Sequence, residues 1–394
     1  MEKKETIGIY EDKKNSSSTV NEYRNYVQWV FGFVGFVIIS ITVLLYLVDP
    51  IDIWGTPRLN GVTHYKSGKG DYAEISKIYE VARLRPEEIY IGNSRIYNGF
   101  PMEASKREYN LAFNGISLKE MRQCLNFVYS VYHPKRVFVG LETMQFIGRP
   151  APIRDTLSDE RLKKIAMGTP TRELMAIWEG IRVSKKLPET IIESIRHSNE
   201  VSPYELGWNG EIGKARQVNR EEYYHTITGF RGAYENGNSN IEDTVNCLYG
   251  ILDDAKENDV EVVLFFSPIS IDLQALQDIT GISDKARDIK REIASVHPIY
   301  DFAWASWLTQ NREDFYTDAS HYNSRTGELM KEALHGEHSD IVQLLTADNS
   351  AEKLRDEYQK YMDWRNLNLE YIVQLKNVSK GYITPGSLSQ YIGF

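Results

Sequence analysis

Short apolar runs recur along the middle of the chain and alternate with segments of helical periodicity. The runs contain few polar interruptions, which is typical of strands buried on both faces of a parallel sheet. Between them, apolar residues recur at three- and four-residue spacing, notably over residues 117–132 and 240–258. This alternation predicts an α/β fold with three layers and a parallel sheet. The predicted strands cover residues 88–92, 108–113, 136–141, 260–266 and 298–302.

The N-terminal region carries a different pattern, a single long apolar segment. Residues 26–48 contain no charged side chain, and about 20 apolar residues are enough for a helix to cross a bilayer. Tyr26 and Tyr46 lie near the two ends, where aromatic rings suit the membrane interfaces. The segment ends in Asp49-Pro50, without the small residues of a signal-peptide cleavage site. We expect an uncleaved transmembrane helix, and a single one, because no second such segment follows.

The distribution of basic residues predicts the orientation of this anchor. Several lysines and one arginine precede it, whereas the next basic residue after it is Arg58. By the positive-inside rule, the N-terminus stays in the cytoplasm and the main domain is extracytoplasmic. The expected location is therefore the cell membrane, with one span. The preceding basic residues are Lys3, Lys4, Lys13, Lys14 and Arg24.

Changes of pattern along the chain suggest its organisation. The polar N-terminal tail lacks apolar periodicity, so we expect it to have no regular structure. Gly and Pro punctuate the segment after the anchor and indicate a connector, which ends in a helix over residues 75–85. The predicted order is a cytoplasmic tail over 1–25, the anchor over 26–48, a connector over 49–85, the α/β domain over 86–335 and a helical extension over 336–394.

An insertion over about residues 150–235 interrupts the alternation of strands and helices. Its patterns predict helices over 158–166 and 171–199, followed by a segment rich in aromatic residues between Tyr204 and Tyr234. The insertion can cap the site or present a surface to a partner. The aromatic residues can stack on sugar rings, although packing as core and rim is the more ordinary role of such residues.

Composition excludes some classes of function. The net charge is −9 and no basic stripe occurs, which argues against a nucleic-acid partner. Cys124 and Cys247 are the only cysteines, and their helix-like surroundings favour two buried thiols over a disulfide. His335 and His338 have a loose metal-ligand spacing, but no third ligand is evident. We expect neither a metal nor a cofactor.

Candidate chemistry begins where the first predicted strand ends, at Gly92-Asn93-Ser94. A serine on the turn after a parallel strand is held at the edge of the sheet, where a substrate can reach it. Much later in the chain, Asp318 and His321 are three residues apart, so one turn can carry both. In that arrangement the Asp orients the His, and the His takes a proton from the serine. The pattern indicates a hydrolase or acyl-transfer site.

Each of these residues also has an ordinary structural alternative. Ser94 can cap the helix that follows the strand, and Asp318 can cap a later helix while His321 lies on the surface. Arg95 can bind an anionic group of the substrate or simply pair with an acid.

The order of these features resembles the SGNH/GDSL hydrolase superfamily. The shared features are a strand, a serine turn, alternating α/β segments and Asp-x-x-His before a C-terminal helix. The chain looks most like the membrane-anchored branch that works in acyl modification of cell-surface polymers. This branch includes the D-alanyl-transfer protein of teichoic acids and accessory proteins of polysaccharide O-acetylation. The resemblance covers roughly residues 86–150 and 255–332, together with the anchor, and implies an SGNH-like, flavodoxin-like sheet.

The resemblance assigns roles to residues block by block. Ser94 matches the nucleophile, and Asp318 and His321 match the final block. In the second block, Asn110-Leu-Ala-Phe-Asn-Gly115 supplies Gly115, whose backbone N–H would help bind the oxyanion.

The third block departs from the family pattern. The family has an Asn that donates to the oxyanion, but this chain has Glu142 in Gly-Leu-Glu-Thr. An ionised carboxylate cannot donate a hydrogen bond. Asn93 and Asn114 are candidate replacement donors, or a partner protein supplies one.

The resemblance implies a function as an O-acyltransferase component, with acetyl as the first candidate for the acyl group. The substrate would be a surface or secreted polysaccharide, and the partner a multi-span membrane acyltransferase or a polysaccharide synthesis complex. Two alternatives use the same fold. One is a polysaccharide esterase or deacetylase with the same triad, and the other is an inactive scaffold of a synthesis or export complex.

Overall fold

Six strands form one sheet in the order β2-β1-β3-β4-β5-β6. Strands β1 to β5 are parallel, and β6 pairs antiparallel with β5. The computed structural model describes residues 5–148, 152–200, 202–210, 220–235, 241–315, 318–382, 384 and 387–388. The strands are β1 (Glu88–Ile91), β2 (Glu108–Asn110), β3 (Arg136–Leu141), β4 (Glu261–Phe266), β5 (Ile299–Asp301) and β6 (Gln343–Leu345).

The prediction of a mixed α/β fold with a largely parallel sheet is confirmed, and each predicted strand coincides with an observed one. The last strand, β6, was not predicted. It has only three residues and lies at the edge of the sheet, so it is too short to show a period of two. The segment after residue 335 is therefore not purely helical, because it completes the sheet before its helices begin.

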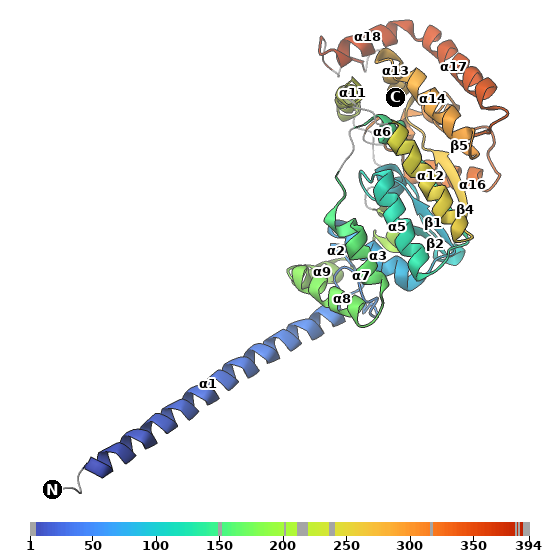
Figure 1. Ribbon diagram of the computed structural model, residues 1–394. Helices are drawn as coiled ribbons and strands as arrows, with labels where there is room; N and C mark the ends of the chain where they lie inside the picture. The colour runs from blue at the N-terminus through green and yellow to red at the C-terminus, as the bar shows by residue number, and fades with distance from the viewer. Residues whose placement is uncertain are drawn as a thin grey trace.

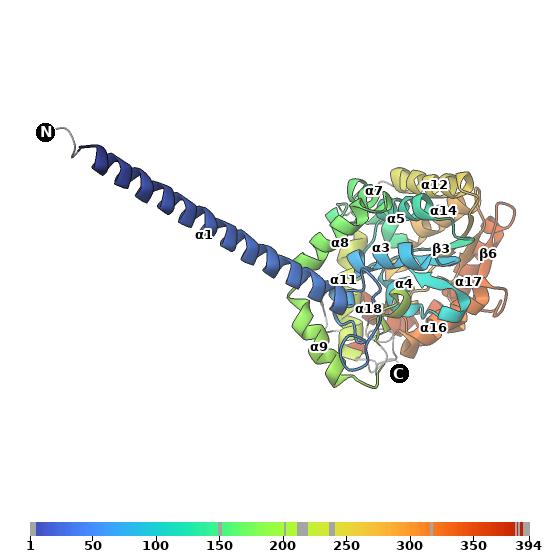
Figure 2. The same ribbon diagram turned by 90° about the horizontal axis from the view of Figure 1, so that it is seen from below.

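Helices lie on both sides of the sheet (Figure 2). Helices α5, α12 and α14 lie on one side, and α4 and α16 lie on the other. The helices are α1 (Glu5–Val48), α2 (Gly68–Asp71), α3 (Ala73–Leu84), α4 (Ser94–Gly99), α5 (Leu118–Val131), α6 (Thr143–Ile147), α7 (Asp159–Ala166), α8 (Thr171–Arg182), α9 (Lys186–Arg196), α11 (Arg220–Glu235), α12 (Ile241–Glu257), α13 (Ile271–Ile279), α14 (Ser283–Ala294), α15 (Trp307–Gln310), α16 (Ser324–Leu334), α17 (Ser350–Leu367) and α18 (Leu369–Ser379).

The inner strands are buried on both faces. In β1 and β3, consecutive side chains are inaccessible to solvent, and the rings of Tyr90 and Phe138 stack with centroids 4.4 Å apart. Burying a side chain of this size contributes about 1.5–3 kcal/mol. The solid apolar runs in the sequence therefore correspond to a sheet covered on both sides. The inaccessible residues are Ile89, Tyr90, Ile91, Val137, Phe138 and Val139.

The insertion contains one more helix break than the sequence predicted. The helix expected over 171–199 is two helices, α8 and α9. Pro188 explains the break, since a proline is tolerated in the first turn of α9 but not in the interior of a longer helix. The predicted start of the insertion, at residue 150, and residues 211–219 within it lie outside the described residues.

Helix α1 projects away from the rest of the molecule (Figures 1 and 2). Its segment Asn21–Val48 is long and apolar enough to cross a membrane, and the mean hydropathy of an 18-residue window within it is 2.6. The expectation of an irregular tail is wrong from Glu5 onward, because the helix already begins there. Extending a formed helix adds one hydrogen bond per residue, and no proline occurs in the tail to stop it. The first four residues lie outside the described part of the chain.

The connector holds the end of α1 through buried polar contacts. The Asp49 carboxylate accepts hydrogen bonds from four backbone N–H groups, those of residues 53 to 56. Lys66 Nζ donates to the carbonyl oxygens of Val48 at 2.7 Å and Asp49 at 2.9 Å, which caps the helix. Burial lowers the pKa of Lys66 to about 8. Together these bonds leave little freedom between α1 and the rest of the structure.

Candidate active site

Ser94 lies at the carboxyl end of β1, as the first residue of α4. Asn93 caps this helix, because its Oδ1 accepts a hydrogen bond of 3.0 Å from the backbone N–H of Arg95. Strand β1 pairs with β2 on one side and β3 on the other, so the order of strands along the chain reverses beside it. Ligands of open α/β sheets bind outside the strand ends at such a reversal. The serine is partly exposed there.

Asp318 and His321 lie in the loop that precedes α16. Oδ1 of Asp318 accepts hydrogen bonds from the backbone N–H groups of Ser320 and His321, at 2.8 and 2.7 Å. Its other oxygen, Oδ2, is 2.7 Å from Nδ1 of His321. Burial opposes ionisation of Asp318, but its bonds to His321 and to the backbone outweigh burial and lower its pKa. The carboxylate thus fixes both the loop and the imidazole ring.

The structure brings the imidazole to the serine. Nε2 of His321 is 2.7 Å from Oγ of Ser94, within hydrogen-bond distance. The three side chains that the sequence singled out therefore form one continuous chain of contacts, with the ring between hydroxyl and carboxylate. Nδ1 faces the carboxylate and Nε2 faces the hydroxyl, which is the arrangement that proton transfer from a serine to the ring requires.

A close helix crossing supports this contact, and the sequence analysis did not identify it. A Cβ atom on Gly327 of α16 would lie 1.8 Å from the carbonyl oxygen of Gly99 in α4. Only glycine allows the two backbones to approach so closely. Because α4 begins at Ser94 and α16 follows His321, this crossing helps to set the distance between them. In the sequence, the available sign of this crossing was a glycine in each of the two segments, Gly99 and Gly327.

Arg95 connects the serine turn to the histidine loop. Its guanidinium is buried and donates to Ser320, with Nη2 2.7 Å from Oγ and Nε 3.1 Å from the carbonyl oxygen. Nη1 forms an ion pair with Glu142, which follows β3. Burial lowers the pKa of Arg95. Of its two expected roles, pairing with an acid is the one that the structure shows.

The candidate oxyanion residues occupy different environments. Gly115 lies in an exposed turn with a positive φ of 60°, a conformation that favours glycine. Asn114 is exposed beside it, whereas Asn93 is buried and serves as the helix cap. Glu142, where the resemblance would place an Asn, directs its carboxylate to Arg95, and this carboxylate supplies no donor.

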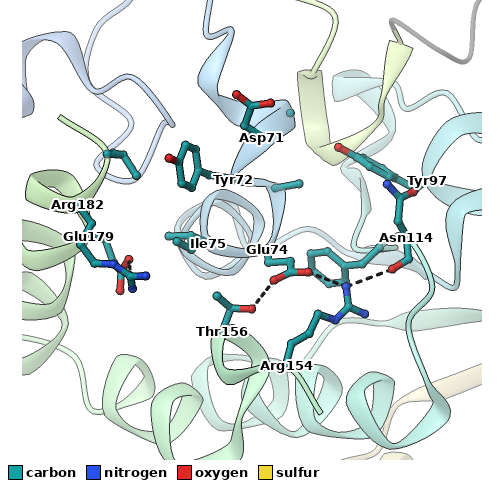
Figure 3. Close-up of a pocket in the computed structure, with 14 residues that line it drawn as sticks. Asp71, Tyr72, Glu74, Ile75, Tyr97, Asn114, Arg154, Thr156, Glu179 and Arg182 are labelled. Carbon is teal, nitrogen blue, oxygen red and sulfur yellow. Dashed lines mark hydrogen bonds and ion pairs between the residues drawn. The ribbon is translucent and has the colours of Figure 1, made fainter. Parts of the chain in front are cut away.

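A cavity of about 410 Å³ lies beside this turn (Figure 3). Tyr97 of α4 and Asn114 lie on one side of it, and Glu179 and Arg182 of α8 lie on the other. Arg154 also lines the cavity, and its Nη1 is 2.6 Å from Oε1 of Glu74 and 3.1 Å from the carbonyl oxygen of Asn114. Its volume and its mixture of aromatic and charged groups suit a small polar ligand.

Other sequence candidates have structural roles or surface positions. Tyr223, Tyr224 and Tyr234 of the insertion are buried, so they contribute to packing. Cys124 is buried and Cys247 partly buried, and both are free thiols.

One group of possible metal ligands occurs in the part of the chain that the structure describes. Glu332, Glu337 and His338 are all exposed and have ligand atoms within 4.8 Å of one another. Oε2 of Glu332 is 2.8 Å from Nε2 of His338. The sequence analysis did not connect these two residues. Exposed acidic residues often gather in this way without an ion, so the group does not define a site.

Comparison with models of known protein families finds no match for this chain, and no curated protein matches it either. The resemblance to SGNH/GDSL hydrolases therefore stays a prediction from the motifs and their order.

Proposed function

We propose that the protein is a membrane-anchored, SGNH-like serine acyltransferase component that modifies a polysaccharide outside the cytoplasm. The observation that carries the proposal is the pair of 2.7 Å contacts that join Ser94 to His321 and His321 to Asp318. A serine hydroxyl is a weak nucleophile, and this arrangement is the usual means of activating it.

The chemistry proceeds in two steps. In the first, Ser94 Oγ attacks the acyl carbonyl while Nε2 of His321 takes its proton, and Asp318 stabilises the resulting imidazolium. Backbone N–H groups of Ser94 and Gly115 hold the oxyanion. His321 then protonates the leaving group, which departs and leaves the acyl group on Ser94. In the second step, His321 deprotonates an acceptor hydroxyl, which attacks the ester and frees the serine.

The topology supports an SGNH-like fold. The order of the first five strands, β2-β1-β3-β4-β5, is that of flavodoxin-like sheets, which bind ligands beside β1 and β3. Ser94 follows β1, and Glu142 follows β3. Fold and site alone fit both transfer and hydrolysis, so the choice between them needs another argument.

The anchor favours transfer. A helix fixed in the membrane keeps the domain where a multi-span acyl donor would be, whereas an esterase gains little from that position. The excess of basic residues before the apolar segment over 26–48 supports an orientation with the domain outside the cytoplasm. The cavity lined by Tyr97 and Asn114, which Ser94 and His321 do not line, offers room for a more distant part of a sugar acceptor.

Two other functions have some support. The partial exposure of Ser94 lets water reach an acyl-serine, which suits an esterase. The ion pair of Glu142 with Arg95 occupies the place of an oxyanion donor, which suits an inactive scaffold. Losing one such donor typically costs about 10²–10³ in rate, so the pairing weakens catalysis without abolishing it.

Labelling with a fluorophosphonate tests the proposal on the full-length protein in detergent. We expect covalent labelling of the protein, loss of labelling in Ser94→Ala, and normal labelling in Ser130→Ala, which alters an exposed helix serine. Absence of labelling at Ser94 would overturn the enzymatic proposal. With an activated acetyl ester and a sugar oligomer, acetylated sugar supports transfer, whereas rapid release of acetate alone supports the esterase.

A further inference from the structure

Helix α8 is apolar on two opposite faces. One face, with Ala176, Gly180 and the C-cap Val183, is buried together with one charged residue, Glu179, which pairs with Arg161. The opposite face carries Leu174, Trp178 and Ile181, whose exposed fractions are 66%, 60% and 40%. These three residues are spaced at i, i+4 and i+7, so they form one continuous stripe. A helix that meets water on its outer side would have polar residues there.

In helix α9 the buried positions are polar and several exposed positions are apolar, the reverse of an ordinary amphipathic helix at a protein surface. Its buried positions are the small polar residues Thr190 and Ser194, and Ser194 Oγ accepts a hydrogen bond from the backbone N–H of Tyr65 at 3.1 Å. Its outer side carries Ile192 and Ile195, with exposed fractions of 47% and 61%. We call the outer residues of the two helices, Leu174, Trp178, Ile181, Ile192 and Ile195, the apolar face of the insertion.

Both helices lie at the point where α1 meets the domain (Figures 1 and 2). A Cβ atom on Gly180 of α8 would lie 2.8 Å from Cη2 of Trp54 and 3.8 Å from Cδ1 of Leu45. Leu45 belongs to the last turn of the membrane-spanning segment. The ring of Tyr46 contacts that of Trp54, with centroids 5.8 Å apart, as aromatic residues do at a membrane interface.

We propose that α8 and α9 lie in the membrane interface and that the apolar face contacts lipid. Two observations favour lipid as the occupant. The two helices that carry the face pack against the end of the membrane-spanning helix, so they lie near the depth of the interface. The face also consists of aliphatic side chains and one tryptophan, the residues that amphipathic helices insert between headgroups and acyl chains. The inference depends on α1 spanning a membrane and not on the chemistry of Ser94.

This contact would give the domain three supports on the membrane instead of one. Helix α1 fixes its position, and α8 and α9 prevent it from tilting about the end of α1. The candidate site would then keep one height and one orientation relative to the membrane surface.

Depth-dependent fluorescence quenching tests the proposal. The full-length chain with Cys247→Ser is reconstituted into vesicles of phosphatidylcholine alone, and an environment-sensitive dye is attached to Leu174→Cys or Ile195→Cys. Cys124 is buried and does not compete for the dye. Phe36→Cys in α1 is the positive control. Leu367→Cys is the negative control, since it is exposed in α17, far from α1 (Figures 1 and 2).

We expect lipids spin-labelled near the headgroup to quench the dye at positions 174 and 195, lipids spin-labelled deep in the chain to quench it at 36, and neither to quench it at 367. Quenching at 36 without quenching at 174 and 195 would overturn the lipid contact. Protection of those sites that appears only with a second membrane protein would assign the face to that protein instead. Lack of quenching at 36 would overturn the anchor and this proposal together. Fluorophosphonate labelling of the same samples reports separately on Ser94.

Discussion

Replacing Asp318 with asparagine should disable the serine while leaving the fold intact. The backbone N–H groups of Ser320 and His321 both donate to Oδ1 of Asp318. In Asp318→Asn, the amide oxygen must take that position, because an NH₂ group there would leave both donors without an acceptor, at about 1–3 kcal/mol for each. The amide NH₂ then faces Nδ1 of His321 and needs an acceptor. The ring proton must move to Nε2, which faces Ser94 and can no longer accept its proton.

The size of this effect follows from the tautomer. An equivalent Asp→Asn change in serine proteases, which preserves the geometry, lowers kcat by about 10⁴. At about 1.36 kcal/mol for each factor of ten, this is roughly 5 kcal/mol of transition-state stabilisation. We expect a similar decrease in the rate of fluorophosphonate labelling at Ser94. Near neutral pH the thermal unfolding midpoint should fall only by the contribution of the ionised carboxylate, because the backbone hydrogen bonds of the loop are kept.

The assay compares labelling rates of full-length Asp318→Asn and of the unaltered protein in the same detergent. Asp340→Asn, a change of an exposed aspartate, serves as the matched control and should leave the rate unchanged. If Asp318→Asn labels within about tenfold of the unaltered protein, which is far above the expected 10⁻⁴, then Asp318 does not set the tautomer and the relay is refuted.

Three further predictions concern the supports of the site. Gly327→Ala should lower the free energy of unfolding by about 1–3 kcal/mol, because the added methyl overpacks the crossing of α4 and α16. The control Gly229→Ala, in open space on α11, should raise the free energy of unfolding by about 0.5–1 kcal/mol. Denaturant titration measures both changes. Arg95→Met should lower the free energy of unfolding by about 3–5 kcal/mol, because Glu142 loses its buried partner. Arg95→Lys should recover part of this stability but should not restore the rate of fluorophosphonate labelling at Ser94. Because the folded-state pKa of Asp318 lies below its unfolded value, its ionisation stabilises the fold above that unfolded value, near 4, and this contribution disappears as the pH falls through the folded-state pKa; Asp318→Asn should therefore lose less stability than the unaltered protein in acid unfolding.

The sequence predicted those elements whose patterns are long and strong. Five strands and the main helices follow directly from apolar periodicity, since burial of one face or both determines the order of residues. Strand β6 was missed because three residues at a sheet edge carry no period. The continuous helix through the N-terminal tail was missed because it extends from the apolar span and not from a pattern of its own.

The site was predictable only in part, for a physical reason. Ser94, Asp318 and His321 were identified because their chemistry restricts which residues can serve. The ion pair of Arg95 and Glu142 joins two segments that are distant in sequence. Nothing in the local pattern around either residue indicates its partner. The departure of Glu142 from the family motif was visible in the sequence, but its compensating contact was not.

The bonds that join Lys66 to the end of α1 limit how far the domain can reach. A flexible tether of n residues would let an enzyme explore roughly 5–6 Å × √n around its anchor. Here the helix passes into hydrogen-bonded structure at Asp49 without such a tether. Under the proposed function, the working radius would therefore be the size of the domain itself, and a polymer would have to pass close to the bilayer to be modified. Polymer chains that have already moved away from the membrane, further than the domain extends, would escape such an acyltransferase.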